Sequence, residues 1–424
     1  MILTYNNCLK NLIIIFYLFT FYSFKKKYTK KMKYFTPFDS ININFSNVFS
    51  QNINYQNNFY FNDADKVRNE LNSIIGIGDC IVDTIAEINE NIIEQYKLEN
   101  DKTKYMNENN KNIFDELNKM SLVRYIPGGS IQNILKSLSF CLYQNQYTNN
   151  NSNNSTNINL KENYIISMLG CVGKDIYKEK IINTLGLNKI KPIIKFSDGE
   201  TSRCAVGFYN KKPFIISDIK SSKNLDKEFI ITNKDKILNH EILLIEGYYI
   251  QNQFEICKEL CELFHREQNK LIIVTLSQIE LNQYLDEKFV HIASYADIIF
   301  SSLSQVEEFT DLKGSIEHQK IFEKLFQKLS DNKKKLLVIK DGKDESYCVE
   351  YDYTKKRLEY ILKCFSQKIK NEEIIDEIGV EDAFFGGFLA GYMKGCSLYT
   401  CLKKGNDVAN IALKNPGCTF EKKK

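Results

Sequence analysis

The 424-residue sequence predicts an α/β fold with a central, mostly parallel sheet and helices on both of its faces. The alternation of two kinds of segment predicts this fold. Short apolar segments such as KLIIVTLS alternate along the chain with longer segments of helical periodicity such as SIEHQKIFEKLFQKLSD. Strand, helix and strand in succession normally form a parallel pair, so repeated alternation builds a parallel sheet. Ligands of such folds bind beyond the carboxyl ends of the strands.

Apolar segments give the expected strands, and helical patterns fill most of the gaps between them. The segments are SIIGIGDCIV (residues 73–82), YIISMLGCVG (164–173), EILLIEGYYI (241–250), KLIIVTLS (270–277), ADIIFSS (296–302) and KLLVIKDG (335–342). One helical segment, NQFEICKELCELFHRE, carries Cys257, Cys261 and His265 at intervals of four residues. We interpret this spacing as a core stripe along one helix face, with a metal cluster as the alternative.

Composition limits the classes of function and partner. A net charge of +4 is small for this length, so the sequence lacks the basic footprint of a nucleic-acid-binding protein. The 12 cysteines are scattered without a CxxC pair, which fits reduced thiols in the cytoplasm better than a disulfide framework. We therefore expect a cytoplasmic protein with small-molecule partners.

Two tracts of biased composition are expected to lie outside the packed core. Residues 1–67 are predicted to be an N-terminal extension, followed by a folded domain of residues 68–424. The apolar run at residues 12–24 is too short for a comfortable membrane span, so stable insertion is not expected. A signal or short anchor is the alternative, and translation from Met32 would remove it. Asn-rich residues 144–163 are predicted to form a disordered surface insertion.

The most informative segment is EIIDEIGVEDAFFGGFLAGY, in which a glycine turn delivers Asp382 to the start of an apolar helix. Gly379 permits backbone angles that other residues resist. Unpaired N–H groups at a helix start, together with the helix dipole, favour a phosphate or a developing oxyanion. A carboxylate beside such a site can accept a proton from an attacking hydroxyl, which is general-base chemistry. The alternative is an aspartate that only caps a buried helix.

Two further segments place polar groups at expected strand ends. GIGDCIVD supplies two aspartates whose paired oxygens can bind vicinal sugar hydroxyls. PGGSIQN precedes a helix, where its glycines allow a ligand to approach the backbone and its polar residues can donate hydrogen bonds. Gly-Gly before a helix is common turn chemistry on its own. Chance seldom produces GIGDCIVD, PGGSIQN and the late GVED turn in this order, however. The substrate-side candidates are Asp79, Asp83, Gly128, Gly129, Ser130 and Asn133.

From about residue 73 to its end, the chain resembles the ribokinase-like (PfkB) sugar and nucleoside kinases, and the adenosine kinases above all. GGSIQN resembles the GGSTQN-type loop of that family, and IIDEIGVEDAFFGGFL resembles its signature IIDTNGAGDAFVGGFL. The segment GCVGKD at residues 170–175 and the closing GCTF at residues 417–420 match two further family segments. Together these segments are specific to the family.

The resemblance implies a Rossmann-like ribokinase fold with a small β-lid, drawn from about residues 87–126 and 191–216, that closes over the substrate and excludes water. It implies that Asp83 holds the ribose hydroxyls, with Gly129 and Asn133 around the sugar. Asp382 would be the base that deprotonates the attacking 5′-hydroxyl, and Asp79 stands where the family has Asn.

The resemblance also implies ATP as the phosphate donor, with Mg²⁺ bridging its phosphates and no protein side chains dedicated to the metal. ATP would lie across the later part of the chain, and a monomer is expected. The implied anion-hole and ATP-binding residues are Gly379, Val380, Glu381, Lys340 and Gly342.

The sequence departs from the family where phosphate chemistry takes place. GAGD is replaced by GVED, which puts the carboxylate of Glu381 in place of a glycine. The NExE motif that supports magnesium is replaced by SLSQ, Ser302 to Gln305, without a carboxylate. The lid arginine of adenosine kinases aligns near Pro213, where only the adjacent lysines could supply positive charge.

These observations leave more than one function open. The first is ATP-dependent phosphorylation of adenosine, or a related nucleoside, to the 5′-monophosphate, a purine-salvage reaction. The second is a catalytically impaired family member that binds a nucleoside or nucleotide without turnover. The third is a sugar kinase of the same fold.

Overall fold

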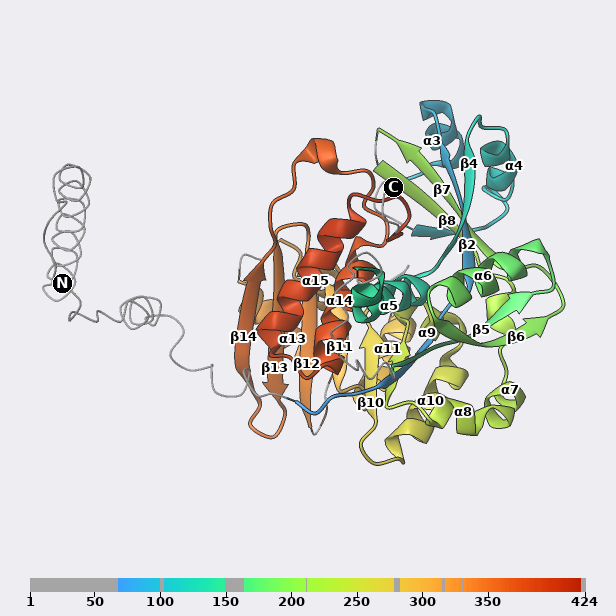
Figure 1. Ribbon diagram of the computed structural model, residues 1–424. Coiled ribbons are helices and arrows are strands. Elements are labelled where there is room, and N and C mark those ends of the chain that lie inside the picture. Colours follow the sequence, from blue (N-terminus) through green and yellow to red (C-terminus); the bar gives the residue numbers. More distant parts are fainter. Residues whose placement is uncertain are drawn as a thin grey trace, which may run out of the picture. The chain divides into compact units, whose positions relative to one another are not determined.

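The computed structural model in Figure 1 describes residues 68–99, 103–148, 164–210, 212–277, 283–314, 317–329, 331 and 333–420. The predicted N-terminal extension, residues 1–67, lies outside the described residues, as does most of the predicted Asn-rich insertion. No helix within the described ranges combines the length and the apolar character that crossing a membrane requires.

The larger of two sheets has nine strands in the order β14-β13-β12-β11-β10-β9-β1-β5-β6. All neighbouring pairs from β6 to β12 are parallel, and β13 and β14 extend the edge as antiparallel strands. The α/β fold with a mostly parallel sheet is therefore confirmed. The strands are β1 Ser73–Ile77, β5 Ile165–Gly173, β6 Ile190–Ser197, β9 Ile242–Ile245, β10 Leu271–Thr275, β11 Ile298–Ser302, β12 Lys334–Asp341, β13 Glu345–Asp352 and β14 Arg357–Phe365.

Helices cover both faces of this sheet, as predicted. Successive side chains of a strand point to opposite faces, so in β1 Ile74 packs into one core cluster while Ile75 and Ile77 pack into another. The first cluster includes α5 (Ser130–Thr148), α14 (Val380–Met393) and α15 (Leu398–Ala412). The second includes α10 (Phe254–His265), α11 (Gln283–Tyr295), α12 (Leu303–Thr310) and α13 (His318–Leu329).

Further helices complete the described part of the chain. They are α3 Glu90–Tyr96, α4 Ile113–Asn118, α6 Ile176–Leu187, α7 Lys227–Thr232, α8 Lys234–Leu238, α9 Gly247–Asn252 and the 3₁₀ turns Ser221–Asn224 and Asn371–Glu373. On α10, Cys257 and Cys261 are buried in the core, and His265 lies edge-on to Tyr295. The cysteine stripe of the sequence therefore packs as a core face.

The second sheet differs from the expected lid in its bounds. Its order is β3-β8-β7-β2-β4, formed by β2 Ile81–Glu87, β3 Thr103–Tyr105, β4 Val123–Gly128, β7 Ser202–Tyr209 and β8 Lys212–Asp218. The expected bounds of residues 87–126 and 191–216 are wrong at two places. The sheet already starts at Ile81, and residues 190–197 form β6 of the larger sheet.

The expected strand at residues 73–82 is in fact two strands in two sheets, β1 and β2. Both strands are buried on both faces, so their residues form one continuous apolar run in the sequence. The run therefore gives no sign that the chain passes from one sheet to the other. The chain passes close to Glu246 where it crosses between the sheets. Only glycine fits at position 78, because a Cβ there would lie 2.2 Å from the Glu246 carboxylate. Asp79 thus lies in the crossing, and Asp83 lies within β2 rather than after a strand.

Close contact of α14 with α5 positions the first turns of both helices. A Cβ on Gly386 would lie 2.4 Å from Ser137 Cβ and 2.6 Å from the Ile134 carbonyl oxygen. On another face of α14, Phe385 stacks on Phe300 of β11 with ring centroids 4.6 Å apart. The small residue therefore lets the two helix backbones approach, while the aromatic pair holds α14 on the sheet.

Replacing Gly386 by Ala should destabilise the protein, because the two helices can accept the added methyl only by moving apart. Overpacking of this kind costs about 1–3 kcal/mol. Urea unfolding measures the change. The control is Gly186→Ala in α6, where nothing lies within 4 Å of the added methyl. There the replacement of a glycine in the last turn of α6 should stabilise by up to about 0.5–1 kcal/mol. Equal unfolding midpoints for the two variants would contradict the close-packing role of Gly386.

Candidate active site

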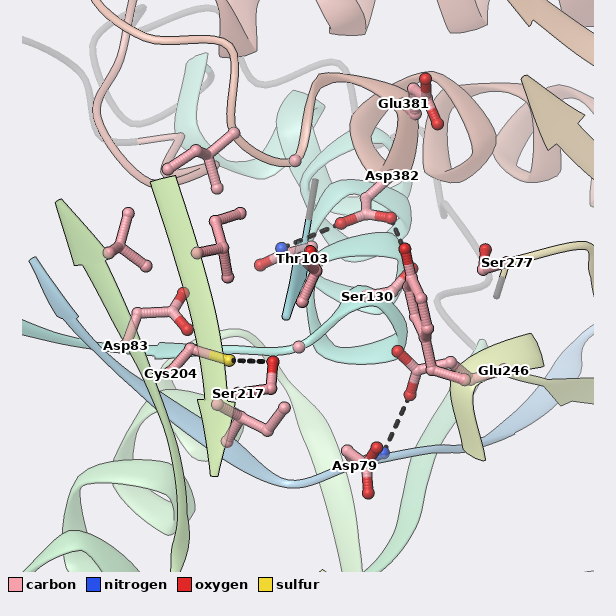
Figure 2. A pocket seen from close by; sticks show the side chains of 18 of the residues that line it. Asp79, Asp83, Thr103, Ser130, Cys204, Ser217, Glu246, Ser277, Glu381 and Asp382 are labelled. Atoms are coloured by element: carbon pink, nitrogen blue, oxygen red, sulfur yellow. Dashed lines mark hydrogen bonds between the residues drawn. The ribbon is translucent and has the colours of Figure 1, made fainter. Parts of the chain in front are cut away.

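A cavity of about 420 Å³ lies where the second sheet faces the ends of β1 and β9 and the first turns of α5 and α14. Figure 2 shows its principal side chains. It brings together predicted residues from distant parts of the sequence. Those that line it are Asp79, Asp83, Gly129, Ser130, Asn133, Gly379, Val380, Glu381 and Asp382.

Asp382, in the first turn of α14, is held from the first turn of α5. Ser130 Oγ donates to Asp382 Oδ1 at 2.6 Å, and Asn133 Nδ2 donates to Asp382 Oδ2 at 3.0 Å (Figure 2). Loss of solvation raises the pKa of Asp382, and the bonds from Ser130 and Asn133 oppose this rise. The carboxylate is thus oriented and made a better proton acceptor than an ordinary surface aspartate.

The turn before α14 requires glycine at position 379. Gly379 has φ +69°, and a Cβ there would lie 2.7 Å from Cys418 Cβ and 3.1 Å from Asn133 Nδ2. Cys418, in the closing GCTF segment, also donates its thiol hydrogen to the Gly379 carbonyl. The C-terminal segment therefore packs directly on the turn that precedes Asp382, so two of the quoted family segments meet in space.

Asp83 faces the cavity from β2 and is tightly enclosed. Gly128, paired with Ile81 at the end of β4, must be a glycine because a Cβ would lie 2.0 Å from Asp83 Oδ2. Gly128 therefore makes room for Asp83 and is not itself among the lining residues. Burial, the largest cause, raises the pKa of Asp83 to about 7, while the charge of Lys136 lowers it.

Asp79 and Glu246 form a pair of buried carboxyl groups. The Asp79 backbone N–H donates to Glu246 Oε2 at 2.9 Å, and both side chains are 2% exposed. Burial raises the pKa of Asp79 to about 7 and raises that of Glu246 as well. Asp79 Oδ1 and Asn133 Oδ1 are buried and have no hydrogen-bond partner within the described part of the chain. Both are acceptors at the cavity wall, and hydroxyl groups of a ligand would satisfy them.

The cavity is strongly acidic. Among the described residues that line it there are six carboxylates and no Lys, Arg or His side chain. Exposed Glu377 at the rim is paired with Lys343. The lining carboxylates are Asp79, Asp83, Glu246, Glu377, Glu381 and Asp382.

Glu381 occupies the side of the cavity toward β11 and β12. Its pKa is raised by loss of solvation and by the neighbouring charge of Asp382, while Lys340 lowers it. Since the residue is exposed, water screens these interactions. Ser302 and Gln305 form a capping box at the start of α12, so these residues of the SLSQ segment serve to end β11 and begin the helix.

Lys340 and Gly342 do not line the cavity. Lys340 is 1% exposed, and its ammonium donates to Ser366 Oγ and Asn406 Oδ1, each at 2.9 Å. Burial lowers the pKa of Lys340 to about 8. Gly342 lies in the turn between β12 and β13 with φ +47°. Pro213 of β8 does line the cavity, whereas the adjacent Lys212 is exposed and does not.

Sequence reasoning missed several lining residues. Glu246 directly follows the apolar segment EILLI, so its place at the carboxyl end of a strand was a usable signal. Thr103 and Tyr105 of β3, Cys204 of β7 and Ser217 of β8 had no such signal. They reach the cavity only because the second sheet folds over it.

The sequence profile described as pfkB family carbohydrate kinase matches residues 101–424. Among curated proteins, adenosine kinase 1 of Arabidopsis thaliana is 22% identical over 82% of this chain and 96% of its own length. The adenosine kinase of Saccharomyces cerevisiae is 20% identical over 83% of this chain and 97% of its own.

Solved structures agree in fold. Anopheles gambiae adenosine kinase in complex with P1,P4-di(adenosine-5) tetraphosphate superposes with a TM-score of 0.70 at 19% identity, covering 81% of this chain and 96% of that chain. Schistosoma mansoni adenosine kinase in complex with 2-fluoroadenosine gives 0.70 at 21% identity, with 82% and 97% covered. A probable sugar kinase of Rhizobium etli gives 0.64 at 15% identity, with 82% and 95% covered.

The buried carboxyl of Asp83 should make stability fall as pH rises. Its pKa is 3.8 in the unfolded reference and about 7 when folded, so the folded state binds more protons between these values. The free energy of unfolding should therefore decrease between about pH 4 and 7, by up to about 4 kcal/mol from this group. Asp83→Asn should flatten the profile in urea unfolding, whereas exposed Asp235→Asn should not. Parallel profiles for Asp83→Asn and wild type would contradict this assignment.

Proposed function

We propose, from the premise that this chain belongs to the pfkB family of carbohydrate kinases, that it transfers the γ-phosphate of ATP to the 5′-hydroxyl of adenosine or a related nucleoside. The observation that carries the proposal is the placement of Asp382. It lies at the start of α14, beside a cavity, with its carboxylate oriented by two donors from α5.

Asp382 would act as the general base. The hydroxyl of the substrate would donate its proton to the carboxylate as its oxygen attacks the γ-phosphorus in line. The first N–H groups of α14 point toward the turn at Gly379 and would stabilise charge on the transferring phosphoryl group. Asp382 therefore supplies proton acceptance, and the helix start supplies electrostatic stabilisation.

A ligand rich in hydroxyl groups fits the other side of the cavity. Asp83 and the unsatisfied acceptors Asp79 Oδ1 and Asn133 Oδ1 all accept hydrogen bonds, and vicinal ribose hydroxyls donate them. The preference for a nucleoside rests on the relatives, which are adenosine kinases. The same acceptors suit a free sugar, so a sugar kinase is the alternative within this class.

Magnesium would reach the site with ATP. Mg²⁺ usually keeps several waters and binds one or two carboxylates together with the phosphates of the substrate. We assign no side chain of the cavity to the ion, because the phosphates of ATP would carry it. Glu381, an exposed carboxylate of the cavity lining, is taken instead to repel those phosphates. When bound, the ion would neutralise charge on the phosphates.

The second candidate is a protein that binds a nucleoside or nucleotide without turnover. The acidic lining favours it, because ATP is an anion and no cationic side chain among the described residues faces the cavity. Pro213 stands where the resemblance implies a phosphate-steadying arginine. The two candidates differ in the expected effect of replacing Asp382. The replacement would abolish turnover in a kinase, whereas in a binding protein it could change only the ligand affinity.

Asp382→Asn should lower kcat for adenosine phosphorylation by at least about a thousandfold and leave adenosine affinity within about threefold, because only the proton acceptor is lost. Coupled ATPase assays and calorimetry on the full chain measure the two quantities. Asp341→Asn, which does not line the cavity, is the matched control. A kinase whose kcat survives Asp382→Asn would have a different base.

Glu381→Gly should raise turnover. Two like charges about 4 Å apart repel by about 1 kcal/mol in water and about 4 kcal/mol at an effective dielectric of 20. Exposure of Glu381 favours the lower value, so we expect an increase of about fivefold. Steady-state kinetics at varied ATP and fixed Mg²⁺ measures it. If turnover falls instead, the carboxylate supports the metal rather than opposing the phosphates.

A further inference from the structure

A second cavity, of about 790 Å³, lies along α5 and is lined by residues other than those of the first cavity. Its walls come from β4, α5, the end of α6 and the C-terminal segment at residues 416–420. These elements lie beside one another in Figure 1. Its volume is within the range of small-molecule sites. None of its lining residues lines the first cavity.

The charge of this second cavity is opposite to that of the first. Its described lining contains Arg124, Lys136 and Lys189 and no Asp or Glu side chain. Lys136 is 4% exposed, and its ammonium donates to the Pro127 carbonyl oxygen at 3.1 Å. A buried ammonium can donate three hydrogen bonds, so an anion in the cavity would add partners to this group.

Aromatic side chains form the rest of the wall. Phe140 of α5 stacks on Phe420, with ring centroids 5.0 Å apart and planes at 21°. The Lys189 ammonium lies 4.1 Å from the centre of the Tyr143 ring. Tyr125 lines the opening and is 36% exposed. Flat rings next to fixed positive charge suit a ligand with an aromatic ring and an anionic group.

We propose that this second cavity binds an aromatic anion of the nucleoside monophosphate class. The base would pack against the aromatic wall, and the phosphate would lie among Arg124, Lys136 and Lys189. The site differs from the proposed substrate site in the sign of its charge. The proposal therefore does not depend on the chemistry at Asp382, and it holds for an active kinase and for a binding protein alike.

The test is calorimetric titration of the full chain with AMP, using charge-reversal variants of two exposed lysines. Lys189→Glu places a repelling charge at the cavity, and Lys191→Glu makes the same change two residues away, outside the lining. We expect a binding event whose Kd rises at least tenfold in Lys189→Glu and stays within twofold in Lys191→Glu. Phe420→Ala should weaken the same event by removing part of the aromatic wall.

AMP could also enter the first cavity as the product of the proposed reaction, so the titration is repeated with Asp83→Ala. If Asp83→Ala still binds AMP, and Lys189→Glu weakens that binding, the result supports the second site. Three results would overturn the proposal: equal affinity in Lys189→Glu and wild type, loss of all AMP binding in Asp83→Ala, or no binding of AMP at millimolar concentration. Circular dichroism of each variant establishes that it is folded.

Discussion

The contact between the first turns of α5 and α14 is the constraint on which the rest of the site depends. Ser130 and Asn133 can hold Asp382 only because the two helices approach at Gly386, and because the glycine turn at 379 leaves room for Asn133. The closing segment of the chain packs on the same turn through Cys418. Segments more than 240 residues apart in sequence thus meet at one carboxylate.

Charge is the second organising feature. The first cavity gathers carboxyl groups that burial drives toward their neutral forms, notably Asp79 and Asp83. A protonated carboxyl can donate a hydrogen bond, and an ionised one only accepts. The wall can therefore pair with a ligand hydroxyl group either as its donor or as its acceptor. The start of α14 offers backbone N–H groups of the kind that bind an anion. Under the proposed function, such a division would place the neutral part of the substrate toward β2 and the phosphates toward the start of α14.

Much of the fold and of the candidate site could be predicted from the sequence, because the informative patterns lie within short segments. The GVED turn and the GGSIQN segment each combine a glycine with a polar residue at the start of a helix, and the structure brings Asp382 to Ser130 and Asn133. The alternation of apolar and helical segments was enough for the sheet. The features that could not be predicted depend on contacts between residues far apart in the sequence. A run that is buried throughout does not reveal that it changes sheets at Gly78. Likewise, the sequence does not reveal that Lys340, near the end of β12, turns inward and donates a buried hydrogen bond to Asn406.

The central claim is that this cavity carries out phosphoryl transfer to a nucleoside hydroxyl. The most direct measurement incubates the full chain with adenosine, Mg²⁺ and ATP labelled on the γ-phosphate, and follows the label. Our account predicts that the label appears in AMP. Adenosine that binds but never acquires label, under conditions where ATP also binds, would contradict it and establish a binding protein built on a kinase fold.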